Sequence, residues 1–281
     1  MKPNSEPTNW ISSFIRPGDV FPIFYCPIVC VNCSLYPGYP ILVSSGASYR
    51  VVSRVFGMPR STVHCIVHRL TEEVVAIRHK VIHLPKTPED LEVVSRGFAG
   101  LARHRAFLRA AGAIDGCHIR IKPPVGPDGH CYRNRKLFPS IFLQAVCDHQ
   151  GCLIDTYVGW PGSVHNSRVL HYSPLYRQSV YPPPRHFILR VNEGVAAQPF
   201  NSHHSRARSI IERAFGMMKT RFRAIFLQAL EVHHTFVPHV SEHIVVTACA
   251  ILHNICLCAG DTMPGLEATI KTELYISHFA M

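Results

Sequence analysis

Apolar residues first recur at a regular spacing in residues 48–70. Between residues 49 and 56 they lie three or four positions apart, and Gly57 can end such a helix in the left-handed conformation. After Pro59, a second helix can begin with Ser61 or Thr62 as its cap. The buried face predicted for this second helix is formed by Val63, Ile66, Val67 and Leu70. Two short helices joined by a glycine-containing turn predict a helix-turn-helix.

The second of these helices also carries polar residues that can contact phosphates or base edges. They are Arg60, Thr62, His64, His68 and Arg69. A plain helical hairpin inside a helical subdomain is the alternative interpretation, because helix-turn-helix patterns are weak evidence when they stand alone.

From residue 113 onward the pattern changes from helical spacing to alternation. Cys117, Ile119 and Ile121 alternate with polar residues, which predicts a strand. Further strands are predicted at 140–147, 152–160 and 186–189, with a turn at 148–151, and long helices at 202–228 and 240–258. A hairpin followed by mixed strands and helices predicts an α/β layer fold.

These patterns divide the chain into four parts. We predict an irregular N-terminal segment (1–46), a helical helix-turn-helix subdomain (47–106), an α/β domain (107–260) and a loose C-terminal tail (261–281). Residues 20–49 carry no charge, but prolines interrupt this stretch repeatedly. A spanning helix needs about 20 continuous apolar residues, so no membrane segment is expected.

The charge balance indicates a polyanionic partner. The chain of 281 residues has 29 Lys+Arg against 18 Asp+Glu, a net charge of +11, and its sequence pI is about 9.3. DNA is the simplest such partner, and an ordinary basic cytosolic protein is the alternative. The 11 cysteines and the polar N-terminal residues favour reduced thiols in the nucleus or cytosol. Cys30 and Cys33 have CxxC spacing, but no second pair follows to complete a zinc site.

Asp115 is the first candidate for chemistry. In the predicted strand it has the same parity as Cys117 and Ile119, so its side chain tends toward the covered face. A buried carboxylate is costly unless it is paired or bound to a metal. A salt-bridged or turn-capping aspartate is the alternative.

Glu212 is the second candidate, in the predicted helix at 202–228. It is the only acid between residues 201 and 223, on a stripe beside the predicted buried seam of Ile211, Phe215, Met218, Phe222 and Ile225. The surrounding basic residues are Arg206, Arg208, Arg213, Lys219, Arg221 and Arg223. Glu212 is either part of an ion pair on a solvated face, worth a few tenths of a kcal/mol, or a metal ligand beside a phosphate-binding edge.

Several separated motifs in order make the chain resemble the PIF/Harbinger transposase-derived nucleases, a group of DDE superfamily endonucleases. The matching stretches are 112–119 (GAIDGCHI), 143–148 (LQAVCD), 159–168 (GWPGSVHNSR), 210–219 (IIERAFGMMK) and 248–255 (ACAILHNI). The resemblance implies an α/β, RNase H-like mixed sheet flanked by helices, preceded by a small helix-turn-helix subdomain. It implies that Asp115 and Glu212 are two of three acids that hold divalent cations, Mg²⁺ or Mn²⁺, for phosphodiester cleavage. It also implies that the protein is associated with DNA in the nucleus, with the cytoplasm as a second location. A separate helix-turn-helix DNA-binding protein is the partner that the resemblance implies.

The sequence departs from the family where the middle acid is expected. Arg190 follows the predicted strand at 186–189 in place of an aspartate, and only residues 190–211 separate that strand from Glu212. Glu193 is the nearest replacement acid, and Asn166 stands where the family usually has aspartate. We therefore expect weak or no cleavage. The alternatives are a catalytically inactive DNA-binding or assembly module, and a truncated product that folds poorly.

Overall fold

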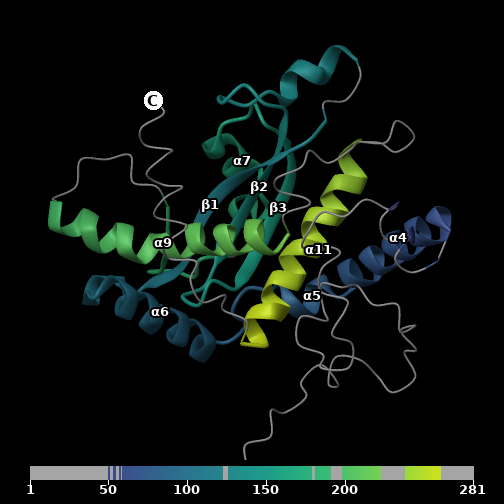
Figure 1. Cartoon of the computed structure of the whole chain (residues 1–281). Coiled ribbons are helices and arrows are strands. Elements are labelled where there is room, and N and C mark those ends of the chain that lie inside the picture. The colour runs from purple at the N-terminus through teal and green to yellow at the C-terminus, as the bar shows by residue number, and fades with distance from the viewer. Residues whose placement is uncertain are drawn as a thin grey trace, which may run out of the picture.

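The structure is a computed structural model that describes residues 50, 53–54, 57, 59–122, 126–178, 181–190, 198–222 and 238–260. Its long first strand, β1 (Ala110–Arg120), pairs antiparallel with β2 (Ser140–Cys147), which pairs antiparallel with β3 (Leu153–Pro161). A short strand, β4 (Phe187–Leu189), pairs parallel with β1 on its other side. The result is a four-stranded mixed sheet of order β3-β2-β1-β4 (Figure 1).

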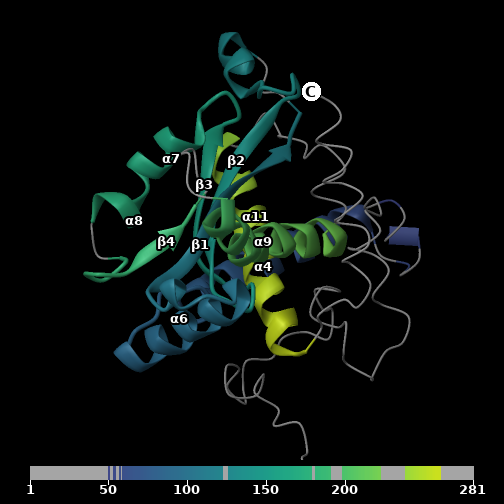
Figure 2. The same cartoon turned by 90° about the vertical axis from the view of Figure 1, so that its left-hand side faces the viewer.

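Helices cover both faces of this sheet. The long helix α9 (Gln198–Arg221) and α6 (Pro88–Ala102) pack against β1, and α11 (Pro238–Cys258) packs against β3. Figure 2 shows α7 (Asn166–Tyr172) and α8 (Pro174–Arg177) on the opposite side of the sheet from α9 and α11. The sheet is therefore the middle layer of a mixed α/β fold, as the sequence predicts.

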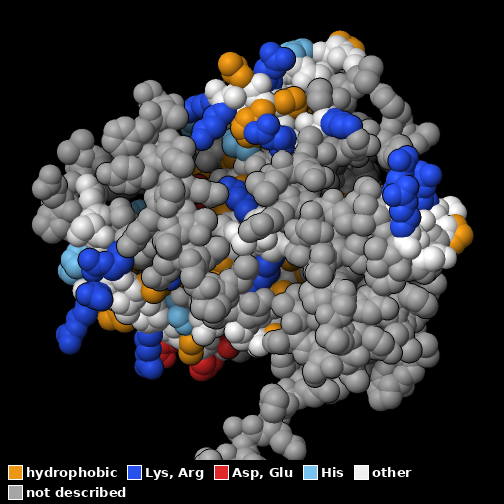
Figure 3. All heavy atoms as spheres, in the orientation of Figure 1, with side chains coloured by type: hydrophobic (Ala, Val, Ile, Leu, Met, Phe, Trp, Pro, Cys, Tyr) orange, Lys and Arg blue, Asp and Glu red, His pale blue; other side chains and the backbone are white. Residues whose placement is uncertain are grey.

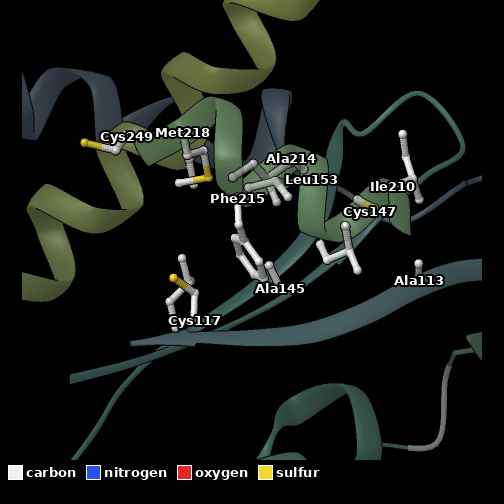
Figure 4. Packing of buried hydrophobic residues seen from close by; sticks show 14 of the residues in the cluster. Ala113, Cys117, Ala145, Cys147, Leu153, Ile210, Ala214, Phe215, Met218 and Cys249 are labelled. Carbon is white, nitrogen blue, oxygen red and sulfur yellow. The ribbon is translucent and has the colours of Figure 1, made fainter. Parts of the chain in front are cut away.

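The main core lies between the sheet and α9. Alternate residues of β2, together with Cys117 and Ile119 of β1, face the buried seam of α9 (Figure 4). That seam consists of Ile211, Phe215, Met218 and Phe222, all buried, as predicted. The fifth predicted member, Ile225, lies outside the described residues. Removing such apolar area from water contributes roughly 25 cal/mol per Å², so the seam fixes which face of α9 meets β1.

Two polar side chains fasten α11 to the sheet. Asn254 is buried and bonds both backbone groups of Leu153. Its Oδ1 accepts the N–H of Leu153 at 2.7 Å, and its Nδ2 donates to the carbonyl of Leu153 at 2.7 Å. His253 is also buried, with Nε2 3.1 Å from the Gly151 carbonyl oxygen and Nδ1 3.2 Å from Arg221 Nη1. The side chains of His253 and Asn254 thus hold α11 against the sheet through their four polar atoms, and we call these two residues the His253–Asn254 clamp.

The N-terminal part is helical where the structure describes it. Helix α4 (Arg60–Ala76) continues six residues beyond the predicted end at Leu70 and packs against α11 and α5 (Arg78–Val81). Gly57 has φ +64°, the left-handed conformation expected of a helix terminator. Most of the first predicted helix of the helix-turn-helix lies outside the described residues, as do the segments 1–46 and 261–281. None of the described helices is long and apolar enough to span a bilayer.

Local chemistry explains where the observed elements differ from the predicted ones. The short 3-10 helices η2 (Arg105–Phe107) and η3 (Pro127–Tyr132) precede and follow β1. Helix α7 begins at Asn166, because the imidazole of His165 accepts the Ser167 N–H and caps the helix there. Helix α9 begins before the predicted residue 202, with Pro199 in its first turn, where the missing N–H of proline costs nothing.

Candidate functional site

Asp115 of β1 and Glu212 of α9 meet at one guanidinium group. Arg208 Nη1 donates to Asp115 Oδ2 at 3.1 Å, and Arg208 Nη2 donates to Glu212 Oε1. The two acids are 97 positions apart in the sequence, and the packing of α9 on β1 brings them together. We call these three residues the acid–arginine cluster.

The acid–arginine cluster is largely covered but reachable from solvent. The exposed fractions of the side chains are 18% for Asp115, 20% for Arg208 and 26% for Glu212. Glu212 thus forms the i,i+4 ion pair that was one interpretation of its position, and it also faces the second acid that the metal-ligand interpretation requires. Two carboxylates around one guanidinium leave the cluster with one net negative charge.

Asp115 is held in place by its own strand. Its Oδ1 accepts the backbone N–H of Gly116 at 2.7 Å, while Oδ2 is bound by Arg208. A Cβ atom at position 116 would lie 1.8 Å from the Phe142 ring of β2, so only glycine allows that ring to cover the strand. The Asp-Gly pair therefore fixes the carboxylate and the strand packing together.

Lys219, a predicted phosphate contact, also reaches β1. Its side chain is hydrogen-bonded to the thiol of Cys117, two residues after Asp115. Burial raises the pKa of that thiol, and Lys219 acts in the opposite direction. Lys219 itself is exposed on α9. Its amino group is turned toward β1, the strand that carries Asp115.

A cleft of about 830 Å³ opens beside Asp115. It runs along the sheet face that α7 and α8 cover and reaches the edge of β1. Its lining is polar and basic at several points, with His118, Arg135, His165, Asn166, Arg190 and His204. Gln144 lies on its wall, buried to 5% exposure, and its side-chain oxygen has no hydrogen-bond partner among the described residues.

Arg190 lines this cleft at the position where the middle acid is expected. Leu189 pairs with Ala113 in the parallel β4–β1 ladder, so Arg190 follows directly beside the stretch of β1 that leads to Asp115. The register thus brings a cation next to the first acid, and the replacement of a middle carboxylate by Arg190 stays a prediction. Glu193, the proposed substitute acid, lies outside the described residues.

The donor set at this place fits one hard cation better than two. Asp115 and Glu212 offer carboxylate oxygens to a common point, which Mg²⁺ can use when water or phosphate oxygens complete its octahedron. Among the described residues, no group of three or more His, Cys, Asp or Glu side chains is arranged to hold a metal. Any cation would also have to displace the Arg208 guanidinium, because it already bonds both acids.

The other predicted DNA contacts are distributed over two helices. On α9, Arg206 is exposed and Arg213 is half-buried, while Arg208 is engaged by both acids. On α4, Arg60, Thr62 and His64 are exposed, and the side chain of Arg69 lies outside the described part. Figure 1 shows α4 beyond α11, away from the place where α9 crosses β1, so the structure does not bring the two groups together.

A basic surface that the sequence analysis missed lies between β1 and β2. We call residues 120–139 the basic lobe, and Figure 3 shows blue side chains at the top of the molecule, where this segment lies. Its exposed cations are Arg120, Lys122, Arg133, Arg135 and Lys136, against a single acid, Asp128, in the segment. Arg135 also lines the cleft. The run of cations beside few acids was the signal, and it was readable in the sequence.

Comparison with known proteins places these features in a family. A family model described as DDE superfamily endonuclease matches residues 114–254, half of the chain. The cattle (Bos taurus) protein "Putative nuclease HARBI1" is 29% identical over 233 residues, covering 77% of this chain and 65% of the relative. The human (Homo sapiens) protein of the same name is 29% identical over 276 residues, covering 84% of this chain and 77% of the relative.

A plant relative extends this similarity. "Protein ALP1-like" from Arabidopsis thaliana is 26% identical over 251 residues, covering 78% of this chain and 59% of the relative. This chain thus spans less than two thirds of the length of the cattle and Arabidopsis relatives. No solved structure matches it.

Proposed function

Because this chain belongs to the Harbinger-derived nucleases of the DDE superfamily endonucleases, we propose that it is a nuclear DNA-binding protein with weak metal-dependent endonuclease activity. Asp115 and Glu212 are its two remaining catalytic acids. The sheet and its helices correspond, in this proposal, to an RNase H-like core. The reaction is hydrolysis of a DNA phosphodiester bond.

One observation carries the proposal: both acids bind Arg208, and Arg190 lines the same cleft as Asp115 where a third acid is expected. Convergence of the acids supports descent from a cleaving site. The positive charges of Arg208 and Arg190 oppose the binding of two metal ions, because like charges repel. The same chain therefore keeps the geometry for one divalent ion and lacks the charge for a pair.

Proteins of this superfamily generally use divalent metal ions, and such an ion, when bound, polarises a phosphoryl oxygen and lowers the pKa of a bound water. The chain's own contribution is positioning. Asp115 is oriented by the Gly116 N–H, and Glu212 is carried by a helix whose buried seam fixes its rotation. Once Arg208 moves away from these acids, its guanidinium can bind a phosphate oxygen of the DNA.

DNA binding in this proposal uses the basic lobe, Arg190 and the exposed side of α9. A duplex phosphate backbone is the ligand that such a distribution of cations fits, because each neutralised phosphate releases condensed counterions. The cleft connects Arg135 of the lobe with Asp115, so a strand held by the lobe can reach Asp115. A separate helix-turn-helix protein and the exposed residues Arg60, Thr62 and His64 of α4 supply further DNA contacts in this proposal.

A plasmid nicking assay tests the catalytic part. We expect slow nicking in Mg²⁺ or Mn²⁺ that disappears in Asp115→Ala and in Glu212→Ala. Arg190→Asp returns an acid to the cleft and should increase the rate, whereas Lys86→Asp, the same kind of charge change in an exposed loop, should not. Rapid nicking by the natural sequence, or nicking that survives loss of either acid, would contradict the proposal.

The alternative is a catalytically inactive DNA-binding or assembly module, favoured by the two arginines at the acids. It predicts no nicking in any variant while duplex binding persists without divalent ions. In both cases the affinity for DNA should fall steeply as salt rises. Double substitution of Arg135 and Lys136 by alanine should reduce that salt dependence, and an unchanged slope would remove the basic lobe from the interface.

A further inference from the structure

The end of α11 lies directly on the turn between β2 and β3. His253 reaches the Gly151 carbonyl, and Asn254 bonds both backbone groups of Leu153. Cys258 is four residues after Asn254, on the same face of the helix. Three hydrogen bonds therefore point this face of α11 at the residues on either side of Cys152.

The thiols of Cys152 and Cys258 are hydrogen-bonded to each other across this contact. Both cysteines are free of disulfides, Cys258 is exposed and Cys152 is half-buried. They are 106 positions apart in the sequence, so their contact depends on the docking of α11. One thiol is open to a small oxidant, and the other lies next to it.

The electrostatic surroundings make the two thiols unequal. The hydrogen bond from Cys152 lowers the pKa of Cys258 to about 7, although burial and the carboxylate of Asp148 act against it. The pKa of Cys152 is raised by the same hydrogen bond, by burial, and by Asp148 and Cys147. A large fraction of Cys258 is thus thiolate at neutral pH, and the thiolate is the reactive form of cysteine.

We propose that Cys258 is a peroxide-reactive thiol and Cys152 its resolving partner, and that their disulfide joins the end of α11 to the β2–β3 turn. An exposed, acidic thiol beside a second cysteine is the arrangement found in redox-sensing pairs. This site shares no residue with the acid–arginine cluster or the cleft, and it is independent of the proposed nuclease function.

The reaction balances with hydrogen peroxide as the oxidant. The Cys258 thiolate attacks one peroxide oxygen, an S–O bond forms, the O–O bond breaks, and the hydroxide released takes up a proton to give water. Cys152 then attacks the sulfenic sulfur, an S–S bond forms, the S–O bond breaks, and the Cys152 proton leaves with the hydroxide as a second water. Two thiols lose two electrons in total, and one peroxide is reduced.

The experiment uses the full chain, reduced, freed of reductant and treated with one equivalent of hydrogen peroxide. Digestion without reduction followed by mass spectrometry should yield a peptide linked through Cys152 and Cys258. The oxidised protein should unfold at a higher urea concentration than the reduced protein, because the crosslink closes a long loop. Absence of the linked peptide while other cysteines are oxidised would overturn the proposal.

Two variants separate the roles of the thiols. In Cys152→Ala, Cys258 should accumulate as a sulfenic acid that dimedone traps, and the pH midpoint of its alkylation by iodoacetamide should rise above 7. Cys65→Ser removes an exposed thiol of α4 and should leave the linked peptide unchanged. If Cys258 of the natural sequence reacts no faster than Cys65, the proposal is wrong, and this result does not require the Cys152 variant to fold.

Discussion

The acid–arginine cluster and the His253–Asn254 clamp both lie within the range that matches the family model, but they differ in how completely their polar atoms are hydrogen-bonded. In the clamp, all four polar atoms of the two side chains bind backbone or Arg221 groups inside the core. In the cluster, two acids share one cation next to an open cleft. The clamp is therefore a structural joint with no free polar atom. The cluster instead keeps one unneutralised acid and can be reached from the cleft.

The largest expected effect breaks the clamp. Asn254→Ala leaves the N–H and carbonyl of Leu153 unpaired in the core, and each unsatisfied buried group costs about 1–3 kcal/mol. We expect the free energy of unfolding, measured by urea denaturation, to fall by about 4 kcal/mol. Glu92→Ala, which removes an exposed ion pair with Arg96, should cost no more than about 0.5 kcal/mol. If the two variants are equally stable, the clamp is not a structural joint.

The next effect concerns pH and the imidazole of the clamp. Burial, the first cause, lowers the pKa of His253 to about 4, with the nearby Arg221 acting in the same direction. The unfolded chain therefore binds a proton near pH 6.5 that the folded chain does not bind until about pH 4. This stabilisation is complete above pH 6.5 and is lost as the pH falls to 4, by about 3 kcal/mol.

Urea unfolding at a series of pH values measures this loss. His253→Gln has no imidazole to titrate, so its free energy of unfolding should lack the His253 contribution to the slope between pH 6.5 and 4. Parallel pH curves for the two proteins would show that the His253 side chain is protonated equally in the folded and unfolded states, and would remove the buried neutral imidazole from the account.

The smallest effect tests the open side of the comparison. Arg208→Gln removes the cation that bonds both acids and should raise the affinity for Mg²⁺ roughly tenfold, or about 1.4 kcal/mol, in a calorimetric titration. Arg206→Gln, an exposed neighbour on the same helix, should change it much less. An unchanged Mg²⁺ affinity in Arg208→Gln would mean that Asp115 and Glu212 do not share a cation site.

The features predictable from the sequence are those that short-range chemistry determines. Strand β2 has the predicted bounds, since Pro139 and a turn delimit it, and Asp148 is a turn residue as expected, accepting the N–H groups of Gln150 and Cys152. The seam of α9 followed from helical periodicity alone. Strand β1 begins at Ala110, earlier than expected, because small apolar residues at 110–113 do not show which period they follow.

Contacts between residues that are far apart in the chain could not be predicted from the sequence. The residues around Glu212 indicated an ion pair or a metal ligand, but only the docking of α9 on β1 shows that Arg208 serves both acids. The contact of Cys152 with Cys258 requires α11 to lie on the β2–β3 turn, which no local pattern records. The catalytic role of Asp115 and Glu212 and the four domain boundaries remain predictions.

The guanidinium of Arg208 also has a consequence for how the chain folds. Two carboxylates brought side by side in a half-covered place repel each other, and many metal-dependent sites fold only when an ion relieves that repulsion. In this protein the repulsion is reduced by Arg208, which lies one helical turn from Glu212. Treatment with a chelator should therefore leave thermal unfolding unaltered, which means that the protein can remain folded in an environment depleted of magnesium.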